Sequence, residues 1–212
     1  MVGIHCTYDM KIVENIIDSL FPPRASELMV RKTTTEILRN CYRPTKVPGC
    51  LCLATYQNPI IKSLITENKF HSNKRAAKLL SVLITEWAEA QSAKIVFIPV
   101  PLGKKRERER GYNQVYAVLK YLKSNPAATV KLNLCLRIKE TSAQHSLPKS
   151  KRLVNVADAF KANHNELQKL RDVTLVVVDD VYTTGATMSA VRAALAPQVH
   201  FSCKIICVAL AH

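Results

Sequence analysis

The segment VTLVVVDDVYTTGATMSAVR (173–192) decides the fold of this chain. Leu175–Val178 is a short run of apolar, mostly β-branched residues, and it predicts a strand that is buried on both faces. Two adjacent carboxylates, Asp179 and Asp180, end this run, and a turn of small, hydroxyl-bearing residues follows them. After the turn, apolar residues recur at helical spacing, so the segment predicts a strand, a loop and a helix in succession.

The loop in this segment has the chemistry of a phosphate site. The first backbone N–H groups of a helix have no partner within the helix, and the helix dipole favours an anion beside them. Gly185 allows the backbone to approach a phosphate closely, and the neighbouring threonine hydroxyls can donate hydrogen bonds to it. The two carboxylates suit a sugar diol, whose hydroxyls donate to them, or a Mg²⁺ ion. The segment therefore predicts a site for a phosphorylated sugar.

The chain carries a large excess of positive charge. Thirty-one Lys and Arg residues against sixteen Asp and Glu residues give a formal net charge of +15. This excess favours anionic partners such as phosphorylated metabolites, nucleic acid or, as a weaker option, a membrane surface. Two segments, 104–110 and 137–152, hold five basic residues each, and we interpret both as exposed basic loops.

The sequence favours a cytoplasmic protein with no membrane span. No apolar run approaches the ~18 residues of a membrane helix, and the first 20 residues mix acidic residues into an amphipathic pattern, unlike a signal peptide. The seven cysteines are odd in number and include no C-x-x-C pair, so we expect reduced thiols. Cys41, Cys50 and Cys52 lie close in sequence, with Cys6 or His5 as a further ligand, but their spacing fits no zinc ribbon or finger. We therefore do not expect zinc.

Strand and helix patterns alternate along the chain. The predicted strands are 94–99, 132–136, 154–160, 175–179 and 204–210, and the predicted helices are 10–20, 36–42, 59–68, 74–90, 112–123 and 163–170. Asn58 and either Ser72 or Asn73 are candidate N-caps, and Trp87 lies on a buried helical stripe. Alternation of this kind predicts an α/β fold with a mostly parallel sheet flanked by helices.

The order of residues 175–187 resembles the signature with which type I phosphoribosyltransferases bind phosphoribosyl pyrophosphate (PRPP). Four apolar residues, two aspartates, two further residues and TTG-x-T follow one another, as in that family. The resemblance implies that Asp179 and Asp180 bind the ribose hydroxyls, directly or with Mg²⁺. It also implies a 5′-phosphate loop, formed by Thr183, Thr184, Gly185, Ala186 and Thr187.

Three further segments resemble the ComF family of competence-associated, phosphoribosyltransferase-like proteins. They are TYQNPIIKSLITENKF (55–70), PVPLGKKRERERGYNQ (99–114) and LRIKETSAQHSLPKSKRLVNVADAF (136–160). The resemblance implies a type I phosphoribosyltransferase fold over residues 55–212, preceded by a small helical N-terminal hood (1–54) that recognises the acceptor. It also implies a role in natural transformation. Members of this family usually carry a four-cysteine zinc element after Leu-Phe-Pro-Pro, but here Arg24–Leu28 offers no thiol, so this element is lost or remodelled.

The remaining candidate residues follow from this resemblance. A pyrophosphate cradle is expected from the backbone of Val100, Pro101, Leu102 and Gly103, with Arg110 and its neighbours Arg106 or Arg108. A closing lid is expected over 137–152, with Arg137, Gln144 and Arg152 as catalytic candidates. For 111–114, an ordinary loop-to-helix junction capped by Asn113 remains an alternative.

Two functions remain open from the sequence. In the first, the protein is a Mg²⁺-dependent phosphoribosyltransferase that releases pyrophosphate from PRPP. In the second, it is a non-catalytic adaptor of the transformation machinery that binds single-stranded DNA through its positive charge, with Tyr112 and Tyr116 stacking on bases. The two activities need not exclude each other, and other competence proteins are expected partners. The oligomeric state is left open, with a dimer as one option.

Overall fold

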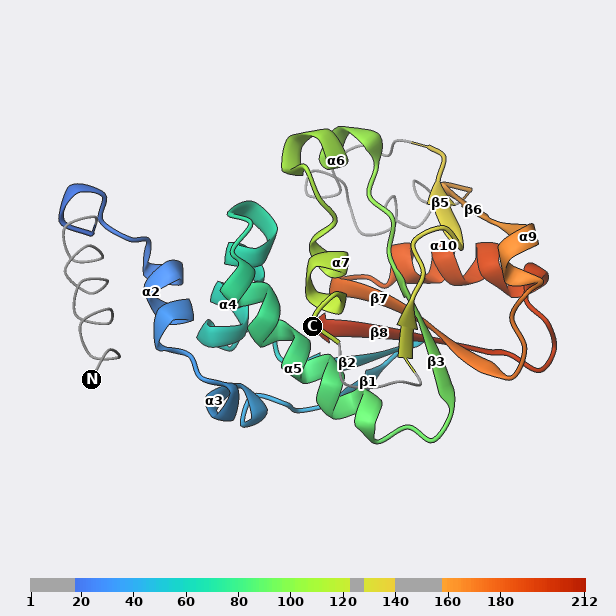
Figure 1. Ribbon diagram of the computed structural model, residues 1–212, viewed down its shortest axis with the longest axis horizontal. Coiled ribbons are helices and arrows are strands. Elements are labelled where there is room, and N and C mark those ends of the chain that lie inside the picture. Colours follow the sequence, from blue (N-terminus) through green and yellow to red (C-terminus); the bar gives the residue numbers. More distant parts are fainter. Residues whose placement is uncertain (1–17, 123–127, 140–157) are drawn as a thin grey trace, which may run out of the picture.

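A computed structural model describes residues 18–122, 128–139 and 158–212 of the chain (Figure 1). Its strands are β1 (Thr45–Val47), β2 (Cys50–Ala54), β3 (Lys94–Pro99), β4 (Ala128–Val130), β5 (Cys135–Arg137), β6 (Phe160–Ala162), β7 (Val173–Val181) and β8 (Lys204–Ala211). Its α-helices are α2 (Ala25–Lys32), α3 (Thr35–Arg39), α4 (Pro59–Phe70), α5 (Lys74–Glu89), α6 (Lys104–Arg110), α7 (Gln114–Leu119), α9 (His164–Leu167) and α10 (Ala186–Leu195).

The central sheet has six strands in the order β1-β2-β8-β7-β3-β4. Only the edge pair β1–β2 is antiparallel, and every other pair in this sheet is parallel. Strands β5 and β6 form a separate antiparallel pair. The predicted α/β fold, a mostly parallel sheet flanked by helices, is therefore confirmed.

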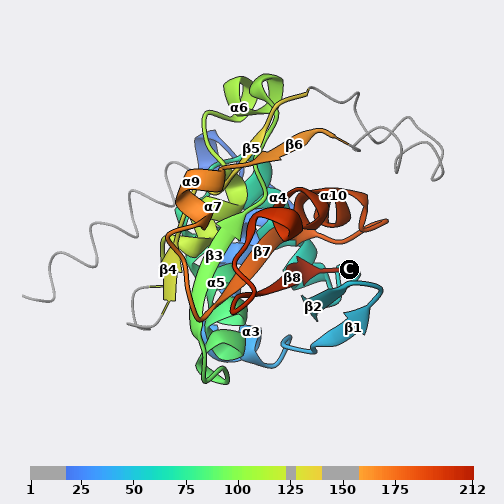
Figure 2. The same ribbon diagram turned by 90° about the vertical axis from the view of Figure 1, so that its right-hand side faces the viewer.

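Strand β7 lies in the interior of the sheet, between β8 and β3 (Figure 2). Its residues Leu175–Val178 are fully buried, as the run of apolar residues predicts. Alternate residues face opposite sides: Val176 and Val178 belong to one hydrophobic core, and Leu175 and Val177 belong to the other. The carboxyl ends of parallel strands meet at one edge of a sheet, so Asp179, close to the C-terminal end of β7, lies at the edge where β3 also ends.

Helices cover both faces of the sheet. Helices α4, α5 and α7 cover the face that carries Phe97 and Val176, and Trp87 packs edge-on against Phe97 there, with ring centroids 6.3 Å apart. Helix α10 and the β5–β6 pair cover the opposite face. The prediction that Trp87 is a core residue is confirmed, since it is buried in the first of these cores.

Several predicted elements are confirmed with small shifts in their ends. Asn58 and Asn73 cap α4 and α5 through side-chain oxygens that accept backbone N–H groups, and Asn163 caps α9 in the same way. The predicted helix at 112–123 is shorter, because Asn113 caps α7 and the helix ends at Leu119. The strand predicted at 132–136 is β5, which begins at Cys135.

The interpretation of 104–110 as an exposed loop is wrong. This run, KKRERER, is helix α6, bounded by Gly103 and by Gly111 in the left-handed conformation. Lys, Arg and Glu are strong helix formers, and pairs four residues apart such as Lys105 and Glu109 support the helix, although it buries no side chain. The sequence analysis also missed α2, β1, β2 and β4.

The N-terminal part of the described chain joins the rest at two places. Helix α2 packs on α4, where Arg24 and Ser26 donate hydrogen bonds to the buried Glu67 carboxylate at 2.7–3.0 Å. Strand β2 pairs with β8, so the central sheet continues across the predicted boundary at residue 54. The division into 1–54 and 55–212 stays a prediction. His5, Cys6 and most of the predicted helix at 10–20 lie outside the described residues.

Candidate active site

The last residue of the loop after β7 has a backbone conformation that favours glycine. Gly185 adopts φ +74°, the left-handed region that side chains rarely occupy, and it precedes the first turn of α10. A Cβ placed on Gly185 would lie 2.6 Å from the Tyr182 hydroxyl oxygen and 2.7 Å from its Cε2. The Gly185 carbonyl accepts from the Ser189 N–H at 2.8 Å, which starts the helix. Both the backbone conformation and the packing against Tyr182 therefore favour glycine at this position of the predicted phosphate loop.

Tyr182 fixes this loop to the ends of neighbouring strands. Its backbone N–H donates to the Ala211 carbonyl of β8 at 2.8 Å. Its hydroxyl donates to the Pro48 carbonyl in the β1–β2 turn at 3.1 Å. Tyr182 therefore fixes the start of the loop to β8 and to the β1–β2 turn. The Thr187 N–H lies in the first turn of α10, where backbone N–H groups have no partner within the helix.

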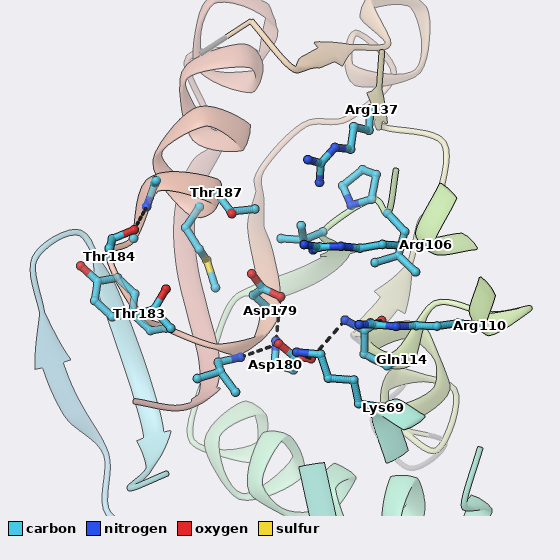
Figure 3. A pocket seen from close by; sticks show the side chains of 18 residues that line it. Lys69, Arg106, Arg110, Gln114, Arg137, Asp179, Asp180, Thr183, Thr184 and Thr187 are labelled. Carbon is cyan, nitrogen blue, oxygen red and sulfur yellow. Dashed lines mark hydrogen bonds and ion pairs between the residues drawn. The ribbon is translucent and has the colours of Figure 1, made fainter. Parts of the chain in front are cut away.

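The two carboxylates of the acidic pair point to different surroundings (Figure 3). The side chain of Asp179 lies in the middle of the pocket, between Thr187 and Arg106. The side chain of Asp180 is buried and lies beside Lys69 and Gln114. Burial and the neighbouring Asp180 carboxylate raise the pKa of Asp179 to about 7.

The candidate pyrophosphate cradle lies at the end of β3. The Val100 N–H donates to the Val178 carbonyl of β7 at 2.9 Å, and the Asn113 side-chain amide donates to the Val100 carbonyl at 2.9 Å. Asn113 also caps α7 by accepting from Val115 N–H at 2.9 Å and Tyr116 N–H at 3.0 Å. Asn113 therefore caps α7, as the alternative for 111–114 predicts, and its side-chain amide also fixes the Val100 backbone of the candidate pyrophosphate cradle.

Four basic side chains reach the same cavity from three parts of the chain. Arg106 and Arg110 lie one turn apart on α6, Lys69 lies in the last turn of α4, and Arg137 is the last residue of β5. The Arg110 guanidinium donates to the Gln114 side-chain oxygen at 2.8 Å and lies 5.6 Å from the centre of the Phe70 ring. Burial is the main cause that lowers the pKa of Arg110, and the charge of Asp180 opposes this effect. Arg137 lies 5.4 Å from the centre of the Phe160 ring.

The structure brings most of the predicted site residues around one cavity. The lining residues from the prediction are Val100, Pro101, Leu102, Arg110, Arg137, Asp179, Asp180, Thr183, Thr184, Gly185, Ala186 and Thr187. Gly103 begins α6 beside the cavity, and Arg108 is not among its lining residues. Gln144 and Arg152 lie outside the described residues. Of the described residues before 55, none lines the cavity, so acceptor recognition by the N-terminal segment stays a prediction.

Sequence reasoning missed several lining residues. Lys69, Gln114 and Tyr182 face the cavity without having been assigned a role there. Lys69 and Gln114 do lie inside two segments that carried the family resemblance, 55–70 and 99–114. These segments were the available signal, but the sequence does not show that the end of α4 and the start of α7 lie beside β7.

Within the described residues, we find neither a cluster of metal-ligating side chains nor a helix that could span a membrane. No group of three or more His, Cys, Asp or Glu side chains that could hold a metal ion occurs within 18–122, 128–139 and 158–212. Mg²⁺ often binds through one or two carboxylates together with substrate phosphates, and the Asp179 carboxylate in the pocket fits that use. No helix in these same ranges is long and apolar enough to cross a membrane.

Comparison with known proteins gives curated relatives and no matching family model. Competence protein F of Haemophilus influenzae is 29% identical over 136 residues, which are 62% of this chain and 58% of that protein. Competence protein ComFC of Bacillus subtilis is 26% identical over 137 residues, 62% of this chain and 51% of that protein. DNA utilization protein YhgH of Escherichia coli is 29% identical over 176 residues, 77% of this chain and 75% of that protein. The chain thus spans little more than half of the first two relatives.

Solved structures with some likeness to this chain are phosphoribosyltransferases. Orotate phosphoribosyltransferase of Mycobacterium tuberculosis has a TM-score of 0.37 and 13% identity, covering 82% of this chain and 78% of that one. Hypoxanthine phosphoribosyltransferase of Staphylococcus aureus has a TM-score of 0.33 and 10% identity, covering 63% and 60%. Scores this low carry no weight here, and the fold rests on the strand order and the β7–α10 loop.

Proposed function

We propose that this chain, which is related to the ComF family of competence proteins, binds PRPP with Mg²⁺ and transfers its phosphoribosyl group to an acceptor, releasing pyrophosphate. The kinship also supports a role in DNA uptake. One observation supports the proposed transferase activity: a single cavity is lined by a loop at the start of a helix, by a carboxylate and by several positively charged side chains, and each of these suits a different part of PRPP. In this proposal the 5′-phosphate binds to the loop at Thr183–Thr187, and the ribose hydroxyls donate hydrogen bonds to the Asp179 carboxylate.

The remaining part of PRPP is its pyrophosphate, the leaving group. Arg106 and Arg110 approach the cavity from α6, and the Val100–Gly103 backbone borders it. The bond from C1 to the pyrophosphate oxygen breaks while C1 takes on cation-like character and the acceptor bonds to C1. Positive groups placed where the leaving charge develops stabilise that transition state, so the chemistry needs no nucleophilic side chain. Mg²⁺, when bound, would supply further charge neutralisation for the phosphates, and the Asp179 carboxylate, which extends into the cavity, would hold it.

The experiment measures PRPP binding by calorimetry with and without Mg²⁺, for the wild type and Asp179→Asn. A hydrogen bond to a charged group contributes about 1.5–3 kcal/mol, so we expect Asp179→Asn to weaken binding by about tenfold or more. Asp172→Asn is the matched control, because it removes the same charge from an exposed position before β7. Equal affinity of wild type and Asp179→Asn contradicts the proposed site, and binding without turnover over a panel of bases and amines contradicts the transfer reaction.

Binding of single-stranded DNA is a second candidate function. It is supported by the net charge of +15 and by α6, whose Lys104, Lys105 and Arg108 side chains are exposed. Of the two tyrosines proposed to stack on bases, Tyr116 is exposed, whereas the Tyr112 hydroxyl donates to the Asn68 carbonyl and its ring is half-buried. Electrostatic binding to DNA weakens steeply with salt.

Oligonucleotide affinity separates the two functions. For the adaptor, we expect affinity that falls with salt and is unchanged in Asp179→Asn, together with a smaller salt dependence in the double variant Lys104→Gln/Lys105→Gln. A salt-independent affinity, or one that the double variant leaves unchanged, contradicts DNA binding through α6. PRPP binding and DNA binding are measured separately, so either can fail alone.

A further inference from the structure

The last turn of α4, residues Glu67–Phe70, lies between the N-terminal part of the described chain and the cavity. A helix has about 3.6 residues per turn, so four consecutive side chains point in all directions around its axis. Here each of them meets a different part of the chain. Glu67 contacts the start of α2, Asn68 contacts α7, Lys69 contacts β7 and Phe70 contacts α6. The last three of these elements all carry residues that line the cavity.

Glu67 joins this turn to the N-terminal part of the chain. Its carboxylate is fully buried and accepts two hydrogen bonds from the Arg24 guanidinium, at 3.0 and 2.9 Å, and one from the Ser26 hydroxyl at 2.7 Å. Its backbone carbonyl accepts from the N–H groups of His71 and Asn73 at 3.1 and 3.2 Å. A buried carboxylate that loses its cation is strongly destabilising. The two-point contact with Arg24 therefore holds the last turn of α4 in its place.

The other end of the turn reaches two cations of the cavity. Lys69 lines the cavity, and its Nζ lies 3.2 Å from Asp180 Oδ2 (Figure 3). The Phe70 ring centre lies 5.6 Å from the guanidinium carbon of Arg110, which also lines the cavity, and such a contact is attractive. Phe70 is 64% exposed, so α4 rather than a surrounding core fixes its ring. A shift of the turn therefore moves both cations.

The loop at Thr183–Thr187 has a separate support. Tyr182 joins it to the Ala211 carbonyl of β8 and to the Pro48 carbonyl in the β1–β2 turn. Neither contact involves the last turn of α4. A change in that turn should thus affect the pyrophosphate side of the cavity, where Arg110 lies, and spare the loop for the 5′-phosphate.

We propose that Arg24 and Glu67 are positioning residues for the cavity: their ion pair sets the last turn of α4 and, through it, Lys69 and Arg110. This inference rests on the proposed binding of PRPP. Arg24 is not among the described residues that line the cavity, so it acts on the ligand only through this turn. Coupling between two sites is reciprocal, so bound PRPP stabilises the docking of α2 by the factor by which docking strengthens PRPP binding.

The first test compares two ligands that differ in the pyrophosphate group. Calorimetry measures the affinities for PRPP with Mg²⁺ and for ribose 5-phosphate in the wild type, Arg24→Met, Glu67→Gln and the double variant. We expect Arg24→Met to weaken PRPP binding by about fivefold or more and to leave ribose 5-phosphate binding unchanged. The double variant should regain most of the PRPP affinity, because it contains no unpaired buried charge. An Arg24→Met protein that binds PRPP as the wild type does, or loses the same factor for both ligands, overturns the proposal.

Arg39→Met is the matched control. Arg39 also joins the N-terminal part of the chain to a core helix, because its Nε donates to Glu86 of α5 at 2.7 Å. Both affinities should be unchanged in this variant, and a loss of PRPP affinity as large as in Arg24→Met overturns a specific role for Arg24. Urea denaturation gives the folded fraction of each variant, so unfolding is not counted as lost affinity. If Arg24→Met does not fold, Arg24→Lys takes its place, since it keeps the charge but loses the two-point contact.

The second test is hydrogen exchange of the wild-type protein. Saturating PRPP should slow exchange at the amides of α2 by about fivefold or more, and ribose 5-phosphate should not. Amides of α2 that exchange equally fast with and without PRPP overturn the coupling.

These measurements separate this inference from the proposed function. A wild type that does not bind PRPP ends both. A wild type that binds PRPP, with an affinity that Arg24→Met leaves unchanged, ends this inference and leaves the proposed function standing.

Discussion

Replacing Gly185 by alanine tests the shape of the phosphate loop. A residue with a side chain costs about 1–2 kcal/mol in the left-handed conformation that Gly185 adopts at φ +74°. The new methyl group would also lie 2.6–2.9 Å from three atoms of the Tyr182 ring and hydroxyl, so the ring must move. Moving it breaks the hydrogen bond from Tyr182 to the Pro48 carbonyl, which contributes about 0.5–1.5 kcal/mol. We therefore expect Gly185→Ala to destabilise the fold by about 2–3 kcal/mol.

Gly111→Ala is the matched control for this experiment. Gly111 has φ +71°, and a Cβ at that position would meet nothing within 4 Å. This variant should therefore lose only the backbone part, about 1–2 kcal/mol. Urea denaturation gives both values, and calorimetry with ribose 5-phosphate gives the affinity, which should fall in Gly185→Ala because the loop moves. Equal destabilisation of the two variants would refute the contact between Tyr182 and the loop.

Three further predictions concern the framework of the fold. Burial opposes the charge of Glu67, but hydrogen bonds from Arg24 and Ser26 outweigh burial and lower the pKa of Glu67 to about 2. The free energy of unfolding should therefore fall as the pH drops from about 4.3 toward 2, and it should fall less steeply in Glu67→Gln. Urea denaturation at each pH measures both. Trp87→Ala should cost about 3–5 kcal/mol in the same assay, and a loss below 1 kcal/mol would contradict its burial. Asn58→Ala should cost about 1 kcal/mol, because its side chain accepts from the first N–H groups of α4, whereas Asn58→Asp should keep most of the stability.

The sequence predicts the part of the site that is continuous in the chain. The apolar run of β7, the acidic pair near the end of that strand and the loop at Thr183–Thr187 follow one another within a few residues, and local chemistry specifies each of them. The caps Asn58 and Asn73 were predictable for the same reason, since a cap depends on its own next three residues.

Contacts between distant segments explain what the sequence analysis missed. Nothing local indicates that Lys69, in the last turn of α4, meets Asp180 near the end of β7, because that contact depends on how the helix packs on the sheet. Helix α6 was missed because it has no apolar stripe, which is the main sequence signal for a helix. The β1–β2 hairpin was missed because both strands are short, although the glycine at its turn, Gly49, has the positive φ that a tight turn requires.

The proposed site depends on the backbone of the β7–α10 loop, whose amides would bind the phosphate of a sugar phosphate. Amide chemical shifts in a ¹⁵N-labelled sample, followed during titration with ribose 5-phosphate, test it most directly. We expect the largest shift changes at the amides of Gly185, Ala186 and Thr187, and these changes should saturate with the same dissociation constant that calorimetry gives. Shift changes elsewhere, with these three amides unmoved at saturation, would contradict it.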